Sequence, residues 1–426
     1  MLPRNNIAAV NIKIRRMVRK MEFKGISKLD LKRRNRMQIL KVIKENGPIS
    51  RVDIAGTLEI TRAAVTIITN EMIEEGVLYE VGEAPVSLEN LQKGRRKILI
   101  DINPEFKYTV GVAINEFSVS IGLSSLQPIV IDKSSMPLTE ETTYEEIITF
   151  VTNEANRMVQ SNSLDFSQVL GMGVSVQPDV CSKMKVYYKD GCLDFSSLEK
   201  AFKKKLEIPV ICMNSISALA LSNQEQKLDE RSGNYIFIKF GKNINMSILL
   251  ENEIMHEYVN HTNQIERVVC VPNGAKLSGY PDGSVKAELS RDAIIAKYAD
   301  ILSKEDTPIF WEATDGNPEN INYKTITIAA SKGEQKVLNI LNDILKSTAM
   351  LINNFSVAFF ARYVVLHDFF MNEWLFDYFK KLITECYGED IAKKIRISRT
   401  ENNLEFTSGC AIAIYEFFYK KGGIIE

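Results

Sequence analysis

The sequence predicts an α/β protein that begins with a winged helix-turn-helix and continues as two α/β lobes around a cleft. Residues 30–75 carry three short helical patterns that are separated by cap residues and turn signals. Residues 77–102 hold two strand-like segments around a polar loop. From residue 108 onward, strand and helix patterns alternate. These three observations define the expected architecture.

Length and composition are those of a globular protein with more than one domain. The chain has 426 residues, 45% hydrophobic and 25% charged, whereas single cores stop growing near ~250–300 residues. Six cysteines are scattered without a CxxC pair, which in so long a chain indicates reduced thiols. The chain shows neither a signal-peptide core nor a run near the ~18 apolar residues of a membrane span. We expect a cytoplasmic protein without a membrane partner.

The net charge of −1 hides an asymmetry along the chain. Residues 1–100 hold 20 Lys and Arg against 11 Asp and Glu, whereas the remaining residues hold 33 against 43. A basic first quarter joined to an acidic remainder indicates that one end meets a polyanion. A solvated basic surface would give the same count, so the structural pattern has to decide.

The first expected domain spans residues 30–100, and its first two helices are marked by turn and cap residues. Helix one stops before Gly47-Pro48, which cannot continue a helix. Ser50 is an N-cap residue, and Arg51 follows it at the start of helix two. The pattern indicates two short helices joined through a tight turn.

Thr61 can cap a third helix whose two faces differ in chemistry. Val65, Ile68 and Met72 recur at helical spacing and should face the core. Gly76 then ends the helix. The outer face is polar near its N-terminal end, where a recognition helix reads major-groove base edges. The residues of these two helices that we expect to face DNA are Arg51, Thr61, Arg62, Ala63, Thr66 and Asn70.

The two strand-like segments after the third helix form the expected wing. Lys93, Arg95 and Arg96 crowd its return side, where they could reach phosphates or a minor groove. The alternative is a three-helix domain for protein contacts with a solvated basic loop. The order of helices, turn and wing favours DNA. We therefore expect double-stranded DNA as a partner.

Residues 1–29 precede these helices and mix apolar with basic side chains. We expect a basic N-terminal tail that is disordered, as chain termini commonly are. Two alternatives stay open, namely an additional basic arm on DNA and translated sequence ahead of a true start at Met17 or Met21.

Two lobes are expected after the winged helix. Residues 101–210, completed by a C-terminal helix at 405–426, form the first, and residues 211–404 form the second with a dimerisation surface. The expected strands lie within residues 108–126, as a hairpin, and at 169–177, 208–214, 235–241 and 246–254. The expected helices lie at residues 143–159, 197–206, 336–355 and 372–387.

Five segments carry a family pattern in a fixed order. They are NRMQILKVIKENGPISRVDIAGTLEITRAAVTIITNEMIEEGVL, GRRKILIDINP, GMGVSVQPDV, IPVICMNSISALAL and VPNGAKLSGYPDGSVKAELS. Together, over residues 30–420, they resemble the ROK family of repressors, open reading frames and sugar kinases, and specifically its DNA-binding repressor branch. The resemblance implies a two-lobed actin-like, sugar-kinase-like ATPase fold and a homodimer or higher homo-oligomer.

The phosphate loops of the family are eroded here. Where family kinases have D-x-G-G-T, this chain has Ile114, Asn115 and Glu116, and a carboxylate beside a phosphate is repulsive. The second loop, G-T-G-I-G-x-G in the family, keeps one glycine and loses others. Its residues are Gly241, Asn243, Asn245 and Ser247, and the family's later Gly-Gly pair is His367-Asp368.

The general base is missing as well. Family kinases use the Asp of an N-D-A-N segment to take the proton from a sugar hydroxyl. This chain has Asn214-Ser215, with no histidine nearby in sequence. A serine cannot act as that base without a partner. We expect no catalytic residue, no cofactor and no kinase activity.

The zinc ligands implied by the family are absent. By alignment, its cysteines fall on Leu277, Gly279 and Ser284, and its histidine falls on Arg267. A structural zinc needs four Cys or His ligands, so we expect no metal. An alternative set at irregular spacing is His256, His261 and Cys270.

The family's sugar-binding positions are also changed. They are occupied here by Asn214, Ser215, Gln264, Arg267 and Lys286. If a sugar-like effector binds, the two added cations favour a sugar acid or sugar phosphate. The alternative is that these residues pair with local carboxylates and no small molecule binds.

These observations predict a sequence-specific transcriptional regulator, a repressor of carbohydrate-related genes, with a catalytically inactive ROK-like sensor module. One alternative is a ROK sugar kinase that also binds DNA. Another is a regulator whose lobes are controlled by a partner protein rather than by a small molecule.

Overall fold

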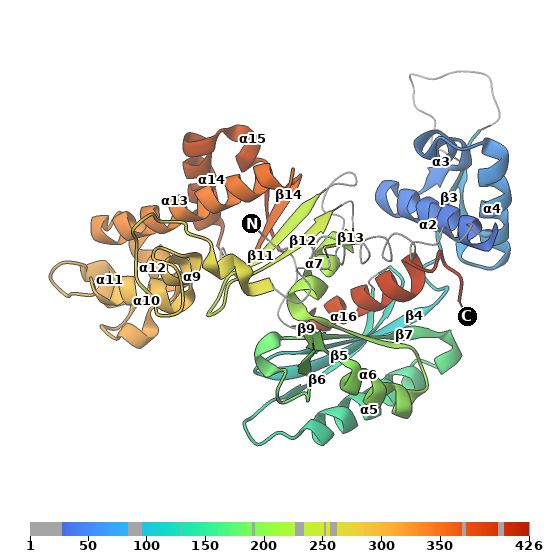
Figure 1. Ribbon diagram of the computed structural model, residues 1–426, viewed down its shortest axis with the longest axis horizontal. Helices are drawn as coiled ribbons and strands as arrows, with labels where there is room; N and C mark the ends of the chain where they lie inside the picture. Colours follow the sequence, from blue (N-terminus) through green and yellow to red (C-terminus); the bar gives the residue numbers. More distant parts are fainter. Residues whose placement is uncertain are drawn as a thin grey trace, which may run out of the picture.

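The computed structural model has a winged-helix head and two α/β lobes, with the C-terminal helix lying over the first lobe and ending beside the head (Figure 1). The structure describes residues 28–83, 96–127, 129–189, 192–225, 234–250, 253–255, 262–368, 372–398 and 404–425. None of the helices among these residues is long and apolar enough to cross a membrane.

The head contains the expected helices and both wing strands. Ser50 caps the second helix by accepting a hydrogen bond from the Asp53 amide, and Thr61 caps the third by accepting one from the Ala64 amide. The elements are α2 (Lys28–Asn46), β1 (Ile49–Ser50), α3 (Arg51–Leu58), α4 (Arg62–Glu74), β2 (Leu78–Glu83) and β3 (Ile98–Ile102). The three strands form an antiparallel sheet in the order β1-β3-β2.

The core of the head confirms the helical spacing that the sequence predicted. Val65, Ile68 and Met72 are buried on the inner face of α4. Gly76 follows the helix with φ +78°, a conformation that favours glycine. The amphipathic pattern of α4 therefore fixes which face is left for contacts outside the head.

The first lobe is built on a five-stranded sheet in the order β10-β7-β4-β5-β6. Strands β4, β5 and β6 are antiparallel neighbours, whereas β4, β7 and β10 run parallel. The strands are β4 (Tyr108–Ile114), β5 (Ser118–Ser125), β6 (Val130–Pro137), β7 (Val169–Val176) and β10 (Val210–Asn214). Helices α5 (Tyr144–Ser161) and α6 (Ser196–Leu206) cover one face (Figure 1).

Strand β6 was not among the strands expected from the sequence. Its side chains alternate between half-buried and exposed, and none of them is fully buried. An edge strand of this kind lacks the apolar alternation by which a strand is recognised in sequence. The short hairpin of β8 (Tyr187–Lys189) and β9 (Cys192–Asp194) was also not expected.

The second lobe repeats the sheet pattern of the first. Its sheet has the order β13-β12-β11-β14-β15, with an antiparallel trio followed by parallel strands. The strands are β11 (Tyr235–Lys239), β12 (Asn245–Leu250), β13 (Glu253–Ile254), β14 (Tyr363–His367) and β15 (Ile395–Ile397). The segment 246–254, expected as strand, is thus divided between β12 and β13.

Helices of different lengths accompany the second sheet. They are α7 (Ser215–Glu225), α9 (Val285–Leu289), α10 (Arg291–Ala299), α11 (Pro308–Ala313), α12 (Tyr323–Ser331), α13 (Gln335–Ala358), α14 (Glu373–Tyr387) and α15 (Glu389–Ala392). Apolar residues of α9 to α15 join those of the sheet in one large core.

Helix α16 (Phe406–Ala413) lies across β4 and β7 of the first sheet and continues as a π-helix to Tyr419. Glycines permit this close approach, since a Cβ on Gly173 would lie 2.0 Å from the carbonyl oxygen of Gly409. The other side of α16 reaches the second lobe, where Ile412 shares a core cluster with Phe237 and Val365. The helix therefore packs against both lobes.

Candidate DNA interface and inter-lobe cleft

The outer face of α4 is open to solvent along its length. The predicted DNA-facing residues exposed there are Thr61, Arg62, Ala63, Thr66 and Asn70. Ile67 shares this exposure, with 61% of its surface accessible, although the sequence analysis did not single it out. Its place in the sequence, directly after Thr66 on the outer face and before the buried Ile68, could have indicated this exposure. The face combines short polar groups, one long cation and an apolar side chain.

Arg51 occupies a different position from the other predicted DNA residues. Only 19% of its side chain is exposed, and Nη2 lies 3.0 Å from the Glu80 carboxylate. Its Nε donates to Thr69 Oγ1 at 3.1 Å, and Nη2 also donates to Asn70 Oδ1 at 3.1 Å. The guanidinium thus joins α3 to α4 and to the wing strand β2. Its fixed fork suits this role of orienting the recognition helix.

The described part of the wing places its cations in exposed ion pairs. Arg96 Nη1 lies 2.9 Å from Glu83 Oε2, and Lys97 Nζ lies 2.7 Å from Asp53 Oδ1. The hydrogen bond from Lys97 is the main reason that the pKa of Asp53 is lowered. Exposed pairs of this kind contribute little stability, so a phosphate can compete for the cations. Lys93 and Arg95 lie outside the described residues.

A small cleft opens where the two lobes meet α16. Residues of β4, β7, α7, β11 and α16 line it, among them Ser215, the first residue of α7. The lining residues are Ala113, Ile114, Asn115, Ser175, Gln177, Ser215, Leu219, Lys239, Glu405 and Ser408. Polar side chains from four elements therefore converge here.

Asn214 ends β10 directly before Ser215 and is fully buried. Its Oδ1 accepts hydrogen bonds from the Ile216 amide at 3.1 Å and from the Ser217 amide at 3.0 Å, which caps α7. Asn214 Nδ2 and Ser215 Oγ are buried without a hydrogen-bond partner among the described residues. Buried polar atoms of this kind are costly unless a water or ligand satisfies them.

The first phosphate-loop position is filled by the protein's own side chains. Asn115 Oδ1 accepts from the Phe117 and Ser118 amides, both at 2.8 Å, and so closes the β4–β5 turn. Its Nδ2 donates to Glu405 Oε2 at 2.5 Å. A second carboxylate thus joins Glu116 near this loop, which disfavours a bound phosphate further.

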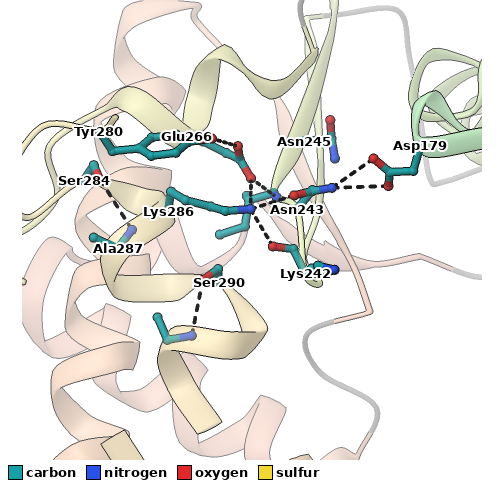
Figure 2. Close-up of polar contacts among 12 residues, drawn as sticks. Asp179, Lys242, Asn243, Asn245, Glu266, Tyr280, Ser284, Lys286, Ala287 and Ser290 are labelled. Atoms are coloured by element: carbon teal, nitrogen blue, oxygen red, sulfur yellow. Dashed lines mark hydrogen bonds and ion pairs between the residues drawn. The ribbon is translucent and has the colours of Figure 1, made fainter. Parts of the chain in front are cut away.

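The second phosphate-loop position is tied to a buried carboxylate, as Figure 2 shows. Glu266, only 2% exposed, accepts from the Ile244 amide at 2.8 Å through Oε1 and from Tyr280 OH at 3.1 Å through Oε2. Lys286 Nζ lies 3.0 Å from Glu266 Oε1. The loop amide at Ile244 is therefore already used by an internal anion.

Lys286 and Asn243 extend this network to the first lobe (Figure 2). Lys286 Nζ donates to Asn243 Oδ1 at 2.6 Å and to the Lys242 carbonyl at 2.7 Å. Asn243 Nδ2 donates to Asp179 Oδ1 at 3.1 Å and Oδ2 at 3.2 Å. Asp179 lies in the turn after β7, so this contact joins the two lobes directly.

The predicted effector residues are thus distributed over three places. Asn214 and Ser215 lie buried at the start of α7, and Lys286 lies in α9 within the Glu266 network. Gln264 and Arg267 are exposed in the 3-10 turn Thr262–Arg267, where Arg267 Nη1 donates to the Gly279 carbonyl at 3.0 Å. Glu266 was not among the expected site residues, although it lies directly before Arg267, where the family's histidine falls.

The segment that aligns with the family's zinc site is tied by an ion pair. Glu288 accepts from the Ala275 amide at 2.5 Å through Oε1, and its Oε2 lies 2.5 Å from Lys297 Nζ. Burial raises the pKa of the nearby Cys270 thiol to about 11. Within the described ranges no cluster of His, Cys, Asp and Glu could hold a metal. His256 and His261 lie outside those ranges.

The two parts of the chain match two family models. Residues 32–79 match a winged helix-turn-helix DNA-binding model, and residues 116–399 match the ROK family model. This chain belongs to the ROK family. The resemblance that the sequence analysis drew to the repressor branch of that family is confirmed.

Known proteins resemble the chain over most of its length. The xylose repressor of Caldicellulosiruptor bescii is 21% identical over 336 residues, which cover 76% of this chain and 82% of the repressor. A ROK family transcriptional regulator described as a homolog of the Escherichia coli MLC protein superposes with TM-score 0.63 and 17% identity. That superposition covers 92% of this chain and 98% of the regulator.

A sugar kinase shares the lobes. The ROK hexokinase of Thermus thermophilus superposes with TM-score 0.55 and 12% identity, covering 71% of this chain and 98% of the hexokinase. The expected fold class, a winged helix-turn-helix followed by a two-lobed sugar-kinase-like fold, is confirmed.

Proposed function

We propose that this protein is a sequence-specific DNA-binding transcriptional regulator, a repressor of carbohydrate-related genes in the cytoplasm. The exposed outer face of α4 carries this proposal, because Arg62 and Thr66 project from the N-terminal half of a helix held by both a capped turn and a wing. That is the geometry in which a recognition helix reads base edges. The similarity to a xylose repressor supports the same function.

We further propose that the ROK module senses a ligand and does not phosphorylate it. Ser215 stands where family kinases have their general base, and Asn115 and Glu405 close the first phosphate loop. An ADP-release assay over a panel of sugars should therefore show no turnover. Turnover that disappears when Asn214 is replaced would instead establish a sugar kinase.

The effector that we propose is a hydroxyl-rich molecule of the sugar class. The two buried polar atoms of Asn214 and Ser215 support it, because sugar hydroxyls both accept and donate hydrogen bonds. Lys286 is neutralised by Glu266, so Arg267 is the remaining one of the two cations that would favour a sugar acid or sugar phosphate. Thermal-shift screening with all three ligand classes separates them. If no ligand raises the melting temperature, control by a partner protein takes the place of this proposal.

A homodimer is part of the proposed mechanism. One helix-turn-helix reads too few base pairs for useful selectivity, and paired heads read two half-sites about 34–36 Å apart. The effector would change DNA affinity by favouring one lobe arrangement over another. Sedimentation of the full chain with and without operator DNA measures the oligomeric state.

Genome-wide footprinting tests whether the protein binds specific DNA sequences. Protein from the native host is crosslinked to DNA, and the bound fragments are sequenced. We expect a small set of sites with a shared inverted repeat beside carbohydrate genes. Binding without a shared sequence would contradict the proposal.

A further inference from the structure

The apolar core of the head is continuous with the C-terminal segment of the chain. Ile414 and Phe418 of the π-helix are buried in the same cluster as Leu40 and Met72 of the head. Lys44 Nζ of α2 lies 4.4 Å from the centre of the Tyr419 ring. The winged helix is therefore packed both on the C-terminal segment and directly on the first lobe, whose Leu126 and Leu170 belong to the same cluster.

One buried arginine links these parts. Arg36 of α2 is 1% exposed, and it is among the largest fully buried side chains of the described residues. Its Nη1 and Nη2 donate to the two Glu75 carboxylate oxygens at 2.9 and 2.5 Å, and its Nε donates to the Gly422 carbonyl at 2.8 Å. Glu75 is the C-cap residue of the recognition helix α4. One planar group thus holds α2, the end of α4 and the C-terminal turn together.

The C-terminal turn fits closely against α2. Gly422 has φ +66°, and a Cβ added there would lie 2.9 Å from the Arg33 carbonyl oxygen and 3.1 Å from Arg36 Cβ. The turn therefore has no room for a larger residue at this point. Arg36 also lies too deep to contact DNA itself, which leaves its internal contacts as its role.

The same C-terminal helix begins at the inter-lobe cleft. Glu405 and Ser408 line that cleft, and α16 then runs between the lobes and continues without interruption to Tyr419. The path from the cleft to Gly422 is one helical rod followed by a single turn. A displacement of α16 against the lobes would reach the head through the end of this rod, beside the direct contacts that Leu126 and Leu170 of the first lobe make with the head core.

We propose that Arg36 is a positioning residue for DNA recognition, which clamps the recognition helix to the C-terminal turn and makes the head and first lobe one rigid unit. The proposal rests on the proposed function, because it concerns how two heads of a homodimer are presented to DNA. Rigid heads hold a fixed separation, so binding requires one spacing between half-sites. Heads released from the clamp tolerate several spacings, and each spacing is bound more weakly.

The test uses the full chain and DNA selected from a random duplex pool by the wild-type protein. Affinities are measured for the selected site, for versions with two to five base pairs inserted between the half-sites, and for a single half-site. Arg36→Lys keeps the positive charge but replaces the planar fork, whose separate nitrogens meet Glu75 and Gly422, by a single ammonium nitrogen. Gly422→Ala disturbs the clamp from the C-terminal side. Gly333→Ala is the matched control, since Gly333 has φ +85° with no atom near its missing Cβ.

We expect Arg36→Lys and Gly422→Ala to bind the selected site about tenfold more weakly and to lose most of the spacing preference, with single-half-site affinity within about twofold of wild type. Gly333→Ala should behave as wild type. An unchanged spacing preference in both clamp variants would overturn the proposal. An equal loss of affinity for the selected site and for the single half-site would also overturn the proposal, because that pattern indicates a damaged head.

The two proposals fail in different ways. If the wild-type protein selects no sequence from the pool, the proposed function fails. If the wild type selects a spaced repeat and the clamp variants keep its spacing preference, only the role of Arg36 fails. Should Arg36→Lys not fold, as judged by circular dichroism, Gly422→Ala decides the outcome because it leaves every side chain of the head in place.

Discussion

Glu266 and Lys286 form a buried ion pair in the second lobe, with Oε1 and Nζ 3.0 Å apart. Lys286 occupies a position that the family uses to bind sugar, and Glu266 lies one residue before another such position, Arg267. Both members of the pair bind the loop at residues 242–244, which corresponds to a phosphate loop of the family. The cation at this sugar-binding position is therefore neutralised by a carboxylate of the protein itself.

Lys286→Met should destabilise the protein by about 2–3 kcal/mol, because it leaves the buried Glu266 carboxylate without a cation. Glu266→Gln should cost less, about 1 kcal/mol, since an amide oxygen can still accept from the Ile244 amide. Urea unfolding measures both. Lys276→Met is the control, as Lys276 is 85% exposed and 3.9 Å from its partner Asp282. A Lys286→Met cost no larger than that of the control would contradict the prediction.

Arg62→Ala and Thr66→Ala should each weaken binding to the selected operator by about 1–3 kcal/mol and relax selectivity at one base position. Both side chains lie on the exposed face of α4, so neither change should alter the fold. Competition between operator variants, base by base, measures the loss of selectivity. If both variants bind operator and mutated operator as wild type does, α4 is not the recognition helix.

Arg95→Ala together with Arg96→Ala should weaken binding to every DNA sequence and leave base preference unchanged. When a phosphate contact is lost, DNA binding releases fewer counterions. The magnitude of the slope of log affinity against log salt concentration should therefore fall by about 1 per contact. A titration at several salt concentrations gives the slope. Because the Arg96–Glu83 pair is exposed, stability should change by less than about 0.5 kcal/mol. A change in base preference would place the wing in a groove that is read by sequence.

His367 should make stability depend on pH. It is buried on β14, and burial lowers its pKa from the usual 6.5 to about 4. The unfolded chain therefore takes up a proton at a higher pH than the folded chain does. The contribution of the neutral, buried His367 imidazole to stability is therefore complete above pH 6.5 and is lost as the pH falls toward 4.

The loss should reach about 3 kcal/mol at the low end of this range. Unfolding of the wild type and of His367→Asn, compared at pH 7 and pH 4.5, isolates it from the carboxylates that titrate in the same interval. The stability difference between the two proteins should shrink or reverse at the lower pH. Parallel pH curves for the two proteins would show that His367 does not titrate in this way.

The sequence by itself determined the head, because its signals act between near neighbours. Ser50 and Thr61 cap helices by accepting hydrogen bonds from amides three residues later, and the spacing of Val65, Ile68 and Met72 selects the buried face of α4. Runs of apolar residues also predicted β4, β5, β7 and β10 of the first sheet and β11 and β12 of the second. The half-exposed edge strand β6 carried no such pattern and was missed.

Only the tertiary structure decided how charged residues are used. The sequence marks Lys286 as an added cation and Arg51 as a candidate DNA contact, but it cannot show that one meets Glu266 and the other meets Glu80. Arg36 is the extreme case, as its Gly422 partner lies 386 positions away. Such contacts depend on where the chain returns in space. A charge whose partner is distant in sequence looks the same as a free one until the fold brings the two together.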